Sequence, residues 1–214
     1  NGAGKTTFFN LLSGNIEPTS GKVIYKGKDI TRLPLHRSAH IGIGRSFQIT
    51  NLFPNLTALE NVRLACQALG KDNFSFLRPA SHFRLYEQRA WAILQQVGLA
   101  ERALMLARTL PHGDQRKLEL GIILAADPEL LLLDEPTAGM AAEQVPELLA
   151  LIKQIQTSGD KTIVLVEHNM NVVMSISDRI TVMHQGQMLA EGTPAEIAAN
   201  ETVQRAYLGG LYEL

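Results

Sequence analysis

The chain has 214 residues, 45% of them hydrophobic, and its 20 lysines and arginines nearly balance its 21 aspartates and glutamates. This length allows one substantial core, in one domain or in a domain with a subdomain. The near-neutral charge argues against a dedicated nucleic-acid-binding protein, which usually carries a basic surplus. The single cysteine, Cys66, cannot form an internal disulfide and suits a reducing compartment. No apolar stretch approaches the ~20 residues that cross a bilayer, so we expect any membrane contact to go through a partner.

The chain begins with a glycine-rich phosphate-binding pattern. This pattern is the second half of G-x-x-x-x-G-K-[ST], the P-loop or Walker A motif, and consists of Asn1, Gly2, Ala3, Gly4, Lys5, Thr6 and Thr7. The glycines let the backbone amides converge on one anion, and the helix that follows adds the positive end of its dipole. We therefore expect Lys5 to reach the β- and γ-phosphates of a nucleotide and the Thr6 hydroxyl to bind Mg²⁺.

Two strands are predicted in the next part of the chain. Residues 22–27 alternate in polarity and end on glycine, as a short strand does. Residues 41–48 resemble a strand with a polar end, where Gln48 could offer a side-chain oxygen to Mg²⁺ and to an attacking water. His36 and His40 lie one helical turn apart, but no third ligand type is nearby, and we interpret them as a solvated helix face.

Residues 49–126 carry helical patterns. Apolar residues recur at helical spacing in residues 56–68 and 86–99. Between these two stretches, residues 70–83 are rich in Gly, Pro, Ser and Asn and predict a long loop. A further helix is predicted over residues 115–125. Since no strand pattern occurs here, we expect a helical subdomain inserted into an α/β core.

Four leucines followed by two acids form a second strong signal. Leu130–Leu133 is apolar on both faces, which is typical of a central strand in a parallel sheet, and Asp134 and Glu135 follow it directly. In P-loop proteins such a strand delivers an aspartate to Mg²⁺ at its C-terminal end. Residues 162–166 predict a second buried strand, with His168 just beyond it.

Near the C-terminus, residues 180–190 predict a hairpin, and Thr193 followed by Pro194 predicts a helix start. Strands that alternate with helices around a P-loop predict an α/β protein with a P-loop NTPase (RecA-like) parallel-sheet core. We expect three parts: an ATPase core of residues 1–48 and 127–192, a helical signature subdomain of residues 49–126, and a C-terminal helical tail of residues 193–214.

Taken in order, these motifs resemble the ATPase subunits of ATP-binding cassette (ABC) transporters over the whole chain. The resemblance implies a Q-loop at Gln48, a Walker B aspartate at Asp134, a catalytic glutamate at Glu135, a switch histidine at His168 and a D-loop at residues 138–141. It implies metal ligation by Thr6, Gln48 and Asp134. It also implies a signature motif, which contacts the partner subunit's ATP and consists here of Leu110, Pro111, His112, Gly113, Asp114 and Gln115.

Within that family the chain most resembles the larger ATPase type of branched-chain amino-acid uptake systems. The segments that carry this likeness are residues 43–48, 52–57, 137–140 and 206–209 and the insertion near residues 70–83. The resemblance implies an ATPase that uses ATP and Mg²⁺ to drive uptake of branched-chain amino acids. It implies a second ATPase subunit, identical or not, two transmembrane permease subunits and, indirectly, a substrate-binding protein. The subunit would lie peripherally on the cytoplasmic face of the inner membrane, with no nucleic acid bound.

The chain also departs from the family pattern. Because the sequence begins inside Walker A, the leading strands and the aromatic residue that stacks on adenine lie outside it, and we expect this fragment to bind ATP poorly or not at all and to be inactive by itself. Pro111 removes a hydroxyl and an amide proton from the signature motif, and Asp114 adds a negative charge there. Ala141 replaces a polar D-loop residue. Alternatives are a urea, amide or other hydrophobic amino-acid importer, a soluble ABC protein that acts on DNA or the ribosome, and a non-hydrolysing regulatory cassette.

Overall fold

The computed structural model describes residues 2–46, 52–68, 70, 84–158 and 161–208. The chain forms two compact units. The first combines Asn1–Arg32 with Val166–Leu214, and the second is Leu33–Leu165. Among the described residues, no helix has both the length and the apolar character that a membrane span requires.

A small sheet lies at the centre of the second unit. Its strands are β3 (Ile43–Arg45), β4 (Leu130–Asp134) and β5 (Thr162–Val166), in the order β3-β4-β5. Strands β3 and β4 run parallel, with Arg45 opposite Leu132. The leucines of β4 between its ends are at most 2% exposed, as expected for a strand covered on both faces. The predicted parallel sheet is confirmed.

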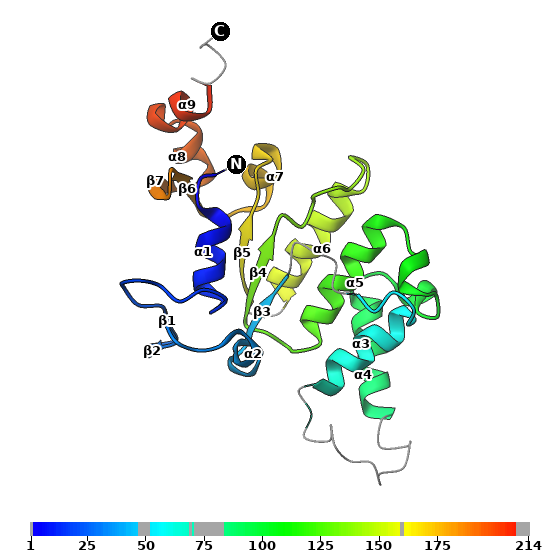
Figure 1. The fold of residues 1–214 in the computed structure, drawn as a ribbon. Helices are drawn as coiled ribbons and strands as arrows, with labels where there is room; N and C mark the ends of the chain where they lie inside the picture. Colours follow the sequence, from blue (N-terminus) through cyan, green and yellow to red (C-terminus); the bar gives the residue numbers. More distant parts are fainter. Residues whose placement is uncertain (1, 47–51, 69, 71–83, 159–160, 209–214) are drawn as a thin grey trace. The chain divides into compact units, whose positions relative to one another are not determined.

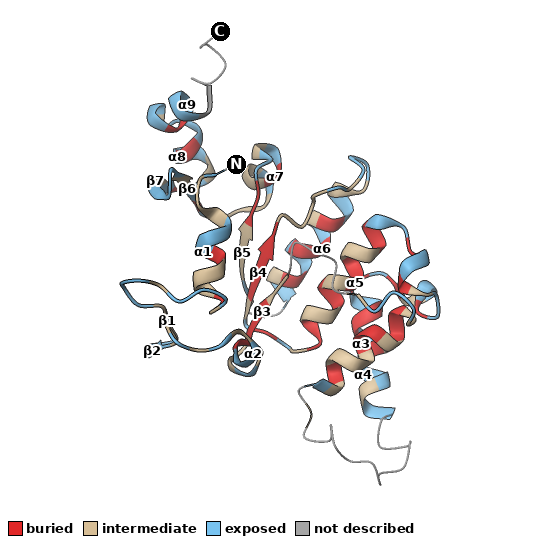
Figure 2. Cartoon of the chain, in the orientation of Figure 1, coloured by how far each residue is buried: buried red, intermediate tan, exposed pale blue. Residues whose placement is uncertain are grey.

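Helices cover this sheet and form a bundle beside it. Helices α3 (Ala58–Ala68), α4 (Arg84–Gln96) and α5 (His112–Leu124) pack on one another, and α6 (Val145–Ser158) packs on α5 (Figure 1). Their apolar faces meet in a buried interior, seen as the inward-facing red segments of Figure 2. The connecting short helices are α2 (Leu35–Ser38) and the 3₁₀ turns Ala39–Ile41, Ala100–Arg102 and Ala107–Thr109.

Helix α5 begins at His112, three residues before the predicted start at residue 115. The physical reason lies in Pro111, whose ring fixes φ at −53° while its ψ of 152° is extended, so that it occupies the N-cap position. The central residues of the signature motif therefore lie in the first turn of α5.

The first unit contains two antiparallel hairpins and several helices. Its elements are α1 (Lys5–Leu12), β1 (Ile24–Tyr25), β2 (Lys28–Asp29), α7 (Met170–Ile176), β6 (Ile180–His184), β7 (Gln187–Gly192), α8 (Pro194–Ala198) and α9 (Glu201–Leu208). The single strand predicted over residues 22–27 is wrong in extent. Lys26 and Gly27 both have positive φ, 49° and 74°, which makes a tight hairpin turn and returns the chain along β2.

The core of the first unit forms where the β6–β7 hairpin meets the C-terminal helices. Ile180, Val182, Ile197 and Val203 are each at most 7% exposed and form one cluster. The predicted hairpin and the predicted helix start at Thr193 are confirmed. The Thr193 hydroxyl accepts a hydrogen bond from the Glu196 amide, and the Glu196 carboxylate accepts one from the Thr193 amide.

Cys66 provides a test of packing in the helical bundle. Its side chain is 3% exposed on α3, and burial raises the pKa of its thiol, with the charge of Arg89 opposing this in part. Because the thiolate is the reactive form, we expect iodoacetamide at pH 8 to leave the native protein unlabelled and to add one label in denaturant, as measured by intact mass. Equal labelling rates in both conditions would contradict this packing.

Candidate functional site

The Walker A segment forms a left-handed turn followed by a helix with an uncapped start. Gly2 and Gly4 have φ of 82° and 90°, and α1 begins at Lys5 with no side chain capping its first amides. The first turn of α1 contains no acid, and its residues are Lys5, Thr6 and Thr7. Uncapped backbone amides and the positive end of a helix dipole therefore lie at the start of α1, an arrangement that suits an anion such as a phosphate.

The β6–β7 turn packs against the Walker A loop and forms a hydrogen bond with it. The Gly186 amide donates a hydrogen bond of 3.1 Å to the carbonyl oxygen of Ala3. A Cβ atom on Gly4 would lie 3.1 Å from the Gly186 Cα atom, in a backbone conformation that side chains rarely adopt. Gly4 is therefore required both for its positive φ and for the close approach of the hairpin turn.

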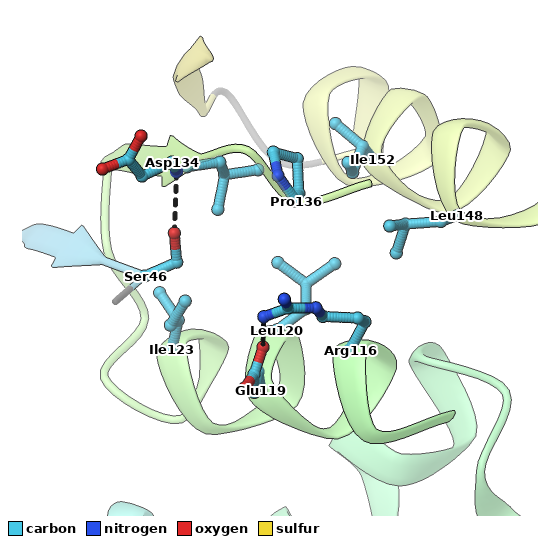
Figure 3. A pocket seen from close by; sticks show the side chains of 10 residues that line it. Ser46, Arg116, Glu119, Leu120, Ile123, Asp134, Pro136, Leu148 and Ile152 are labelled. Carbon is cyan, nitrogen blue, oxygen red and sulfur yellow. Dashed lines mark hydrogen bonds and ion pairs between the residues drawn. The ribbon is translucent and has the colours of Figure 1, made fainter. Parts of the chain in front are cut away.

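The Walker B end of β4 is held against the end of β3. Asp134 is 4% exposed, and its amide donates a 2.8 Å hydrogen bond to the Ser46 hydroxyl (Figure 3). Burial lowers the pKa of the neighbouring Arg45, and the negative charge of Asp134 acts in the opposite direction. Gln48, the expected Q-loop residue, lies outside the described residues.

Glu135 sits directly after β4 in a strained backbone conformation. Its φ is 47°, a left-handed value that costs a non-glycine residue about 1–2 kcal/mol. The turn that it opens is closed by a 3.0 Å hydrogen bond from the Ala138 amide to the Glu135 carbonyl oxygen. Such strain persists where surrounding contacts impose it, and it is common at functional sites. Glu135 and Asp134 thus share the C-terminal edge of the sheet, where ligands of α/β proteins bind.

The charge of Asp114 in the signature motif is balanced inside the second unit. Its side chain is 11% exposed and forms an ion pair with Arg102, while Lys117 lies 3.6 Å away. Lys117 in turn contacts Glu147 of α6 at 2.6 Å. With two cations beside it, Asp114 presents little net negative charge to an anion at the start of α5.

The signature motif and the D-loop touch each other within the second unit. A Cβ atom on Gly139 would lie 3.3 Å from the His112 ring, so the absence of a side chain at Gly139 allows the two segments to approach. A Cβ atom on Gly113 would lie 2.8 Å from the side-chain oxygen of Gln144, which follows the D-loop. The Gln115 side chain closes the motif with a 3.0 Å hydrogen bond to the carbonyl oxygen that precedes Pro111.

His168 is exposed and follows β5 in the first unit. The next residue, Asn169, caps α7 by accepting hydrogen bonds from the amides of Asn171 and Val172. The structure thus gathers the Walker A segment and His168 in the first unit. It gathers the Walker B acids, the signature motif and the D-loop in the second. A single site that contains both groups of residues stays a prediction.

Within the part of the chain that the structure describes, protein side chains alone do not form a closed metal site. Among residues 2–46, 52–68, 70, 84–158 and 161–208, no group of three or more His, Cys, Asp or Glu side chains could hold an ion. Mg²⁺ commonly binds through one or two protein oxygens together with substrate phosphates. The Thr6 hydroxyl and the buried Asp134 carboxylate are oxygen donors of the kind that this mode uses.

Sequence reasoning missed two residues that make contacts near the Walker B strand. The Ser46 hydroxyl supports Asp134, and Arg116 on α5 binds Glu119 and the carbonyl oxygen of Ala138. The Arg116–Glu119 spacing of three residues is a visible helix-pair signal. Ser46 and Arg116 contact backbone atoms of residues that are distant in the sequence. These contacts depend on tertiary packing, and no local sequence pattern predicts them.

Comparison with known proteins identifies the class of protein that has this fold and these motifs. The ABC transporter family profile matches residues 1–138, and LivG of Escherichia coli K12, named a high-affinity branched-chain amino acid transport ATP-binding protein, is 42% identical over 98% of this chain and 84% of its own length. The chain belongs to the family of ABC transporter ATP-binding proteins. The profile of branched-chain amino acid ATP-binding cassette transporters also matches residues 187–212, which places the chain in the branched-chain amino-acid branch of that family.

Solved structures agree with this assignment. The ADP conformation of MJ1267, an ATP-binding cassette of an ABC transporter, has a TM-score of 0.81 and 25% identity over 98% of this chain and 85% of its own. The dimeric post-hydrolysis state of the cassette MJ0796, bound to ADP and Pi, has a TM-score of 0.73 and 27% identity over 90% and 81%. The predicted P-loop NTPase fold is confirmed.

Proposed function

We propose that this protein is the ATP-hydrolysing subunit of an ABC importer for branched-chain amino acids. The observation that carries the proposal is the near full-length similarity to LivG, a transport ATP-binding protein of that substrate class. The match of the branched-chain profile to residues 187–212 supports the same substrate class from a separate part of the chain.

The proposed mechanism assigns each motif a task in phosphoryl transfer. The amides of the Walker A loop and Lys5 bind the β- and γ-phosphates. Thr6, Gln48 and Asp134 would hold Mg²⁺, which would neutralise charge on the phosphates when bound with ATP. Glu135 accepts a proton from the attacking water as general base, and His168 orients the γ-phosphate by hydrogen bonding.

The second ATPase subunit completes the site in this proposal. The signature residues of one subunit face the nucleotide held by the Walker A motif of the other. The dimeric state of the cassette MJ0796 supports the pairing of two ATPase subunits. Pro111 cannot donate a hydrogen bond to that nucleotide, so the amides in the first turn of α5 carry the contact. Two permease subunits would connect the dimer to the membrane on its cytoplasmic face, and a substrate-binding protein would deliver the solute.

Leucine uptake tests the proposed substrate class. In a host that lacks its own branched-chain importers, we expect the full-length protein, expressed with its permeases and binding protein, to drive uptake of labelled leucine. Excess isoleucine and valine should compete, and urea should not. The Glu135→Gln variant is the matched control and should reduce uptake to the vector background. Uptake of urea in preference to leucine would overturn the assignment.

A further inference from the structure

Arg116 connects the signature helix to the turn that carries Glu135. On α5, its Nη1 atom donates a 2.8 Å hydrogen bond to Glu119 Oε2, and its Nη2 atom donates a longer one, at 3.4 Å, to the carbonyl oxygen of Ala138. The Arg116 and Glu119 side chains are 13% and 14% exposed. The guanidinium group is thus held by a partly buried carboxylate on its own helix, and its second nitrogen donates a hydrogen bond to the backbone of the D-loop.

The segment that Arg116 reaches needs outside support. Glu135 opens it with a φ of 47°, and the Ala138 amide closes it on the Glu135 carbonyl oxygen at 3.0 Å. Gly139 follows with a φ of 75°, against the ring of His112. Arg116 and His112 both lie on α5, so the same helix holds this turn at two adjacent points. The backbone strain at Glu135 requires such contacts to persist.

A small cavity lies beside Arg116, so the contact of Arg116 with the Ala138 carbonyl oxygen does not depend on tight packing around the side chain. The cavity has a volume of about 20 Å³, and its lining includes Arg116, Glu119, Asp134 and Pro136 (Figure 3). Within the described residues, Arg116 Nε and Glu119 Oε1 are buried without a hydrogen-bond partner. The space is enough for one water molecule. A lysine at position 116, which is slightly smaller than arginine and differs in shape, therefore fits beside Glu119 without overpacking.

We propose that Arg116 is a positioning residue that fixes the turn Glu135–Ala138 and thereby the orientation of the Glu135 carboxylate. This inference rests on the proposed function, in which Glu135 is the general base. Because α5 begins with the signature motif, the contact also connects the motif that faces the partner's nucleotide with the base that serves the subunit's own nucleotide. Arg116 itself touches no reacting atom.

Arg116→Lys tests the positioning role with little risk to the fold. Lysine keeps a positive charge beside Glu119 but lacks the planar fork that binds two acceptors at once. In the full-length protein assembled with its permeases, we expect kcat for ATP to fall about 3- to 10-fold and KM to change less than 2-fold. Arg63→Lys is the matched control, since Arg63 forms the same three-residue pair with Glu60 on α3 and its described hydrogen bonds stay on that helix. It should leave kcat unchanged.

Two further measurements separate positioning from a merely structural role. If Arg116 acts through Glu135, Arg116→Lys added to Glu135→Gln lowers the rate no further, whereas a multiplicative loss overturns the proposal. Hydrogen exchange of the Ala138 amide should accelerate several-fold in Arg116→Lys and not in Arg63→Lys. Unchanged exchange together with a parental kcat would also overturn it. If the parental protein had no ATPase activity, the proposed function would be overturned instead. The hydrogen-exchange rate of the Ala138 amide would still test whether Arg116 stabilises the turn Glu135–Ala138.

Discussion

Glu135→Gln is expected to lower the ATP turnover of the full-length protein by roughly 10²–10⁴-fold, the range for loss of a general base. ATP affinity should stay within about 2-fold of the parent, because the neutral amide keeps the size and shape of the carboxylate and Glu135 contacts the water rather than the phosphates in the proposed mechanism. Steady-state phosphate release and equilibrium binding of a fluorescent ATP analogue give the two quantities.

The control for this variant is Glu143→Gln, which removes the same charge from an exposed position in the segment after the D-loop. It should hydrolyse ATP at the parental rate. If Glu135→Gln also hydrolysed ATP at the parental rate, Glu135 would not be the general base, and the role of Arg116 would lose its target.

Lys5→Ala should instead abolish nucleotide binding. In the proposed site the ammonium group contacts two phosphates, and hydrogen bonds to charged groups contribute about 1.5–3 kcal/mol each. The loss predicts a Kd for ATP that is about 100-fold higher or more. Isothermal titration of the full-length variant with ATP and Mg²⁺ measures this directly.

Lys28→Ala provides the comparison for the Lys5 variant. Lys28 is an exposed lysine on β2 in the same unit, and its removal should leave the Kd within about 2-fold of the parent. Normal ATP affinity in Lys5→Ala would show that the glycine-rich segment is an ordinary turn before a helix, and the phosphate-binding assignment would be wrong.

Elements with strong local signals were predictable from the sequence. β4 is a run of leucines without a polar face and stands out as a buried strand. The β-branched run of residues 162–166 likewise indicates a strand, but the expectation that it is buried is wrong in part, because only Val166 of β5 is buried. Thr193 with Glu196 three residues later announces a capping box before α8. The residues expected in the site were likewise visible, because P-loop chemistry requires particular residue types after particular strands.

The remaining features depend on contacts between distant residues. The charge balance of Asp114 comes from Arg102 and Lys117, and the second of these is held by Glu147 of another helix. No local pattern indicates that Arg116 reaches the D-loop backbone 22 residues later. α5 begins three residues before the predicted start because Pro111, which is extended and has no amide proton, occupies the N-cap position. The helical periodicity of residues 115–125 does not indicate this earlier start.

A crystal structure of full-length Glu135→Gln bound to ATP and Mg²⁺ tests the central claim most directly. We expect the γ-phosphate to lie within hydrogen-bonding distance of Lys5, with Thr6 and Asp134 on the side of the Mg²⁺ ion. The substituted side chain at position 135 should face the water that lies in line with the γ-phosphate. A nucleotide bound elsewhere, or Lys5 and position 135 facing separate cavities, would contradict it.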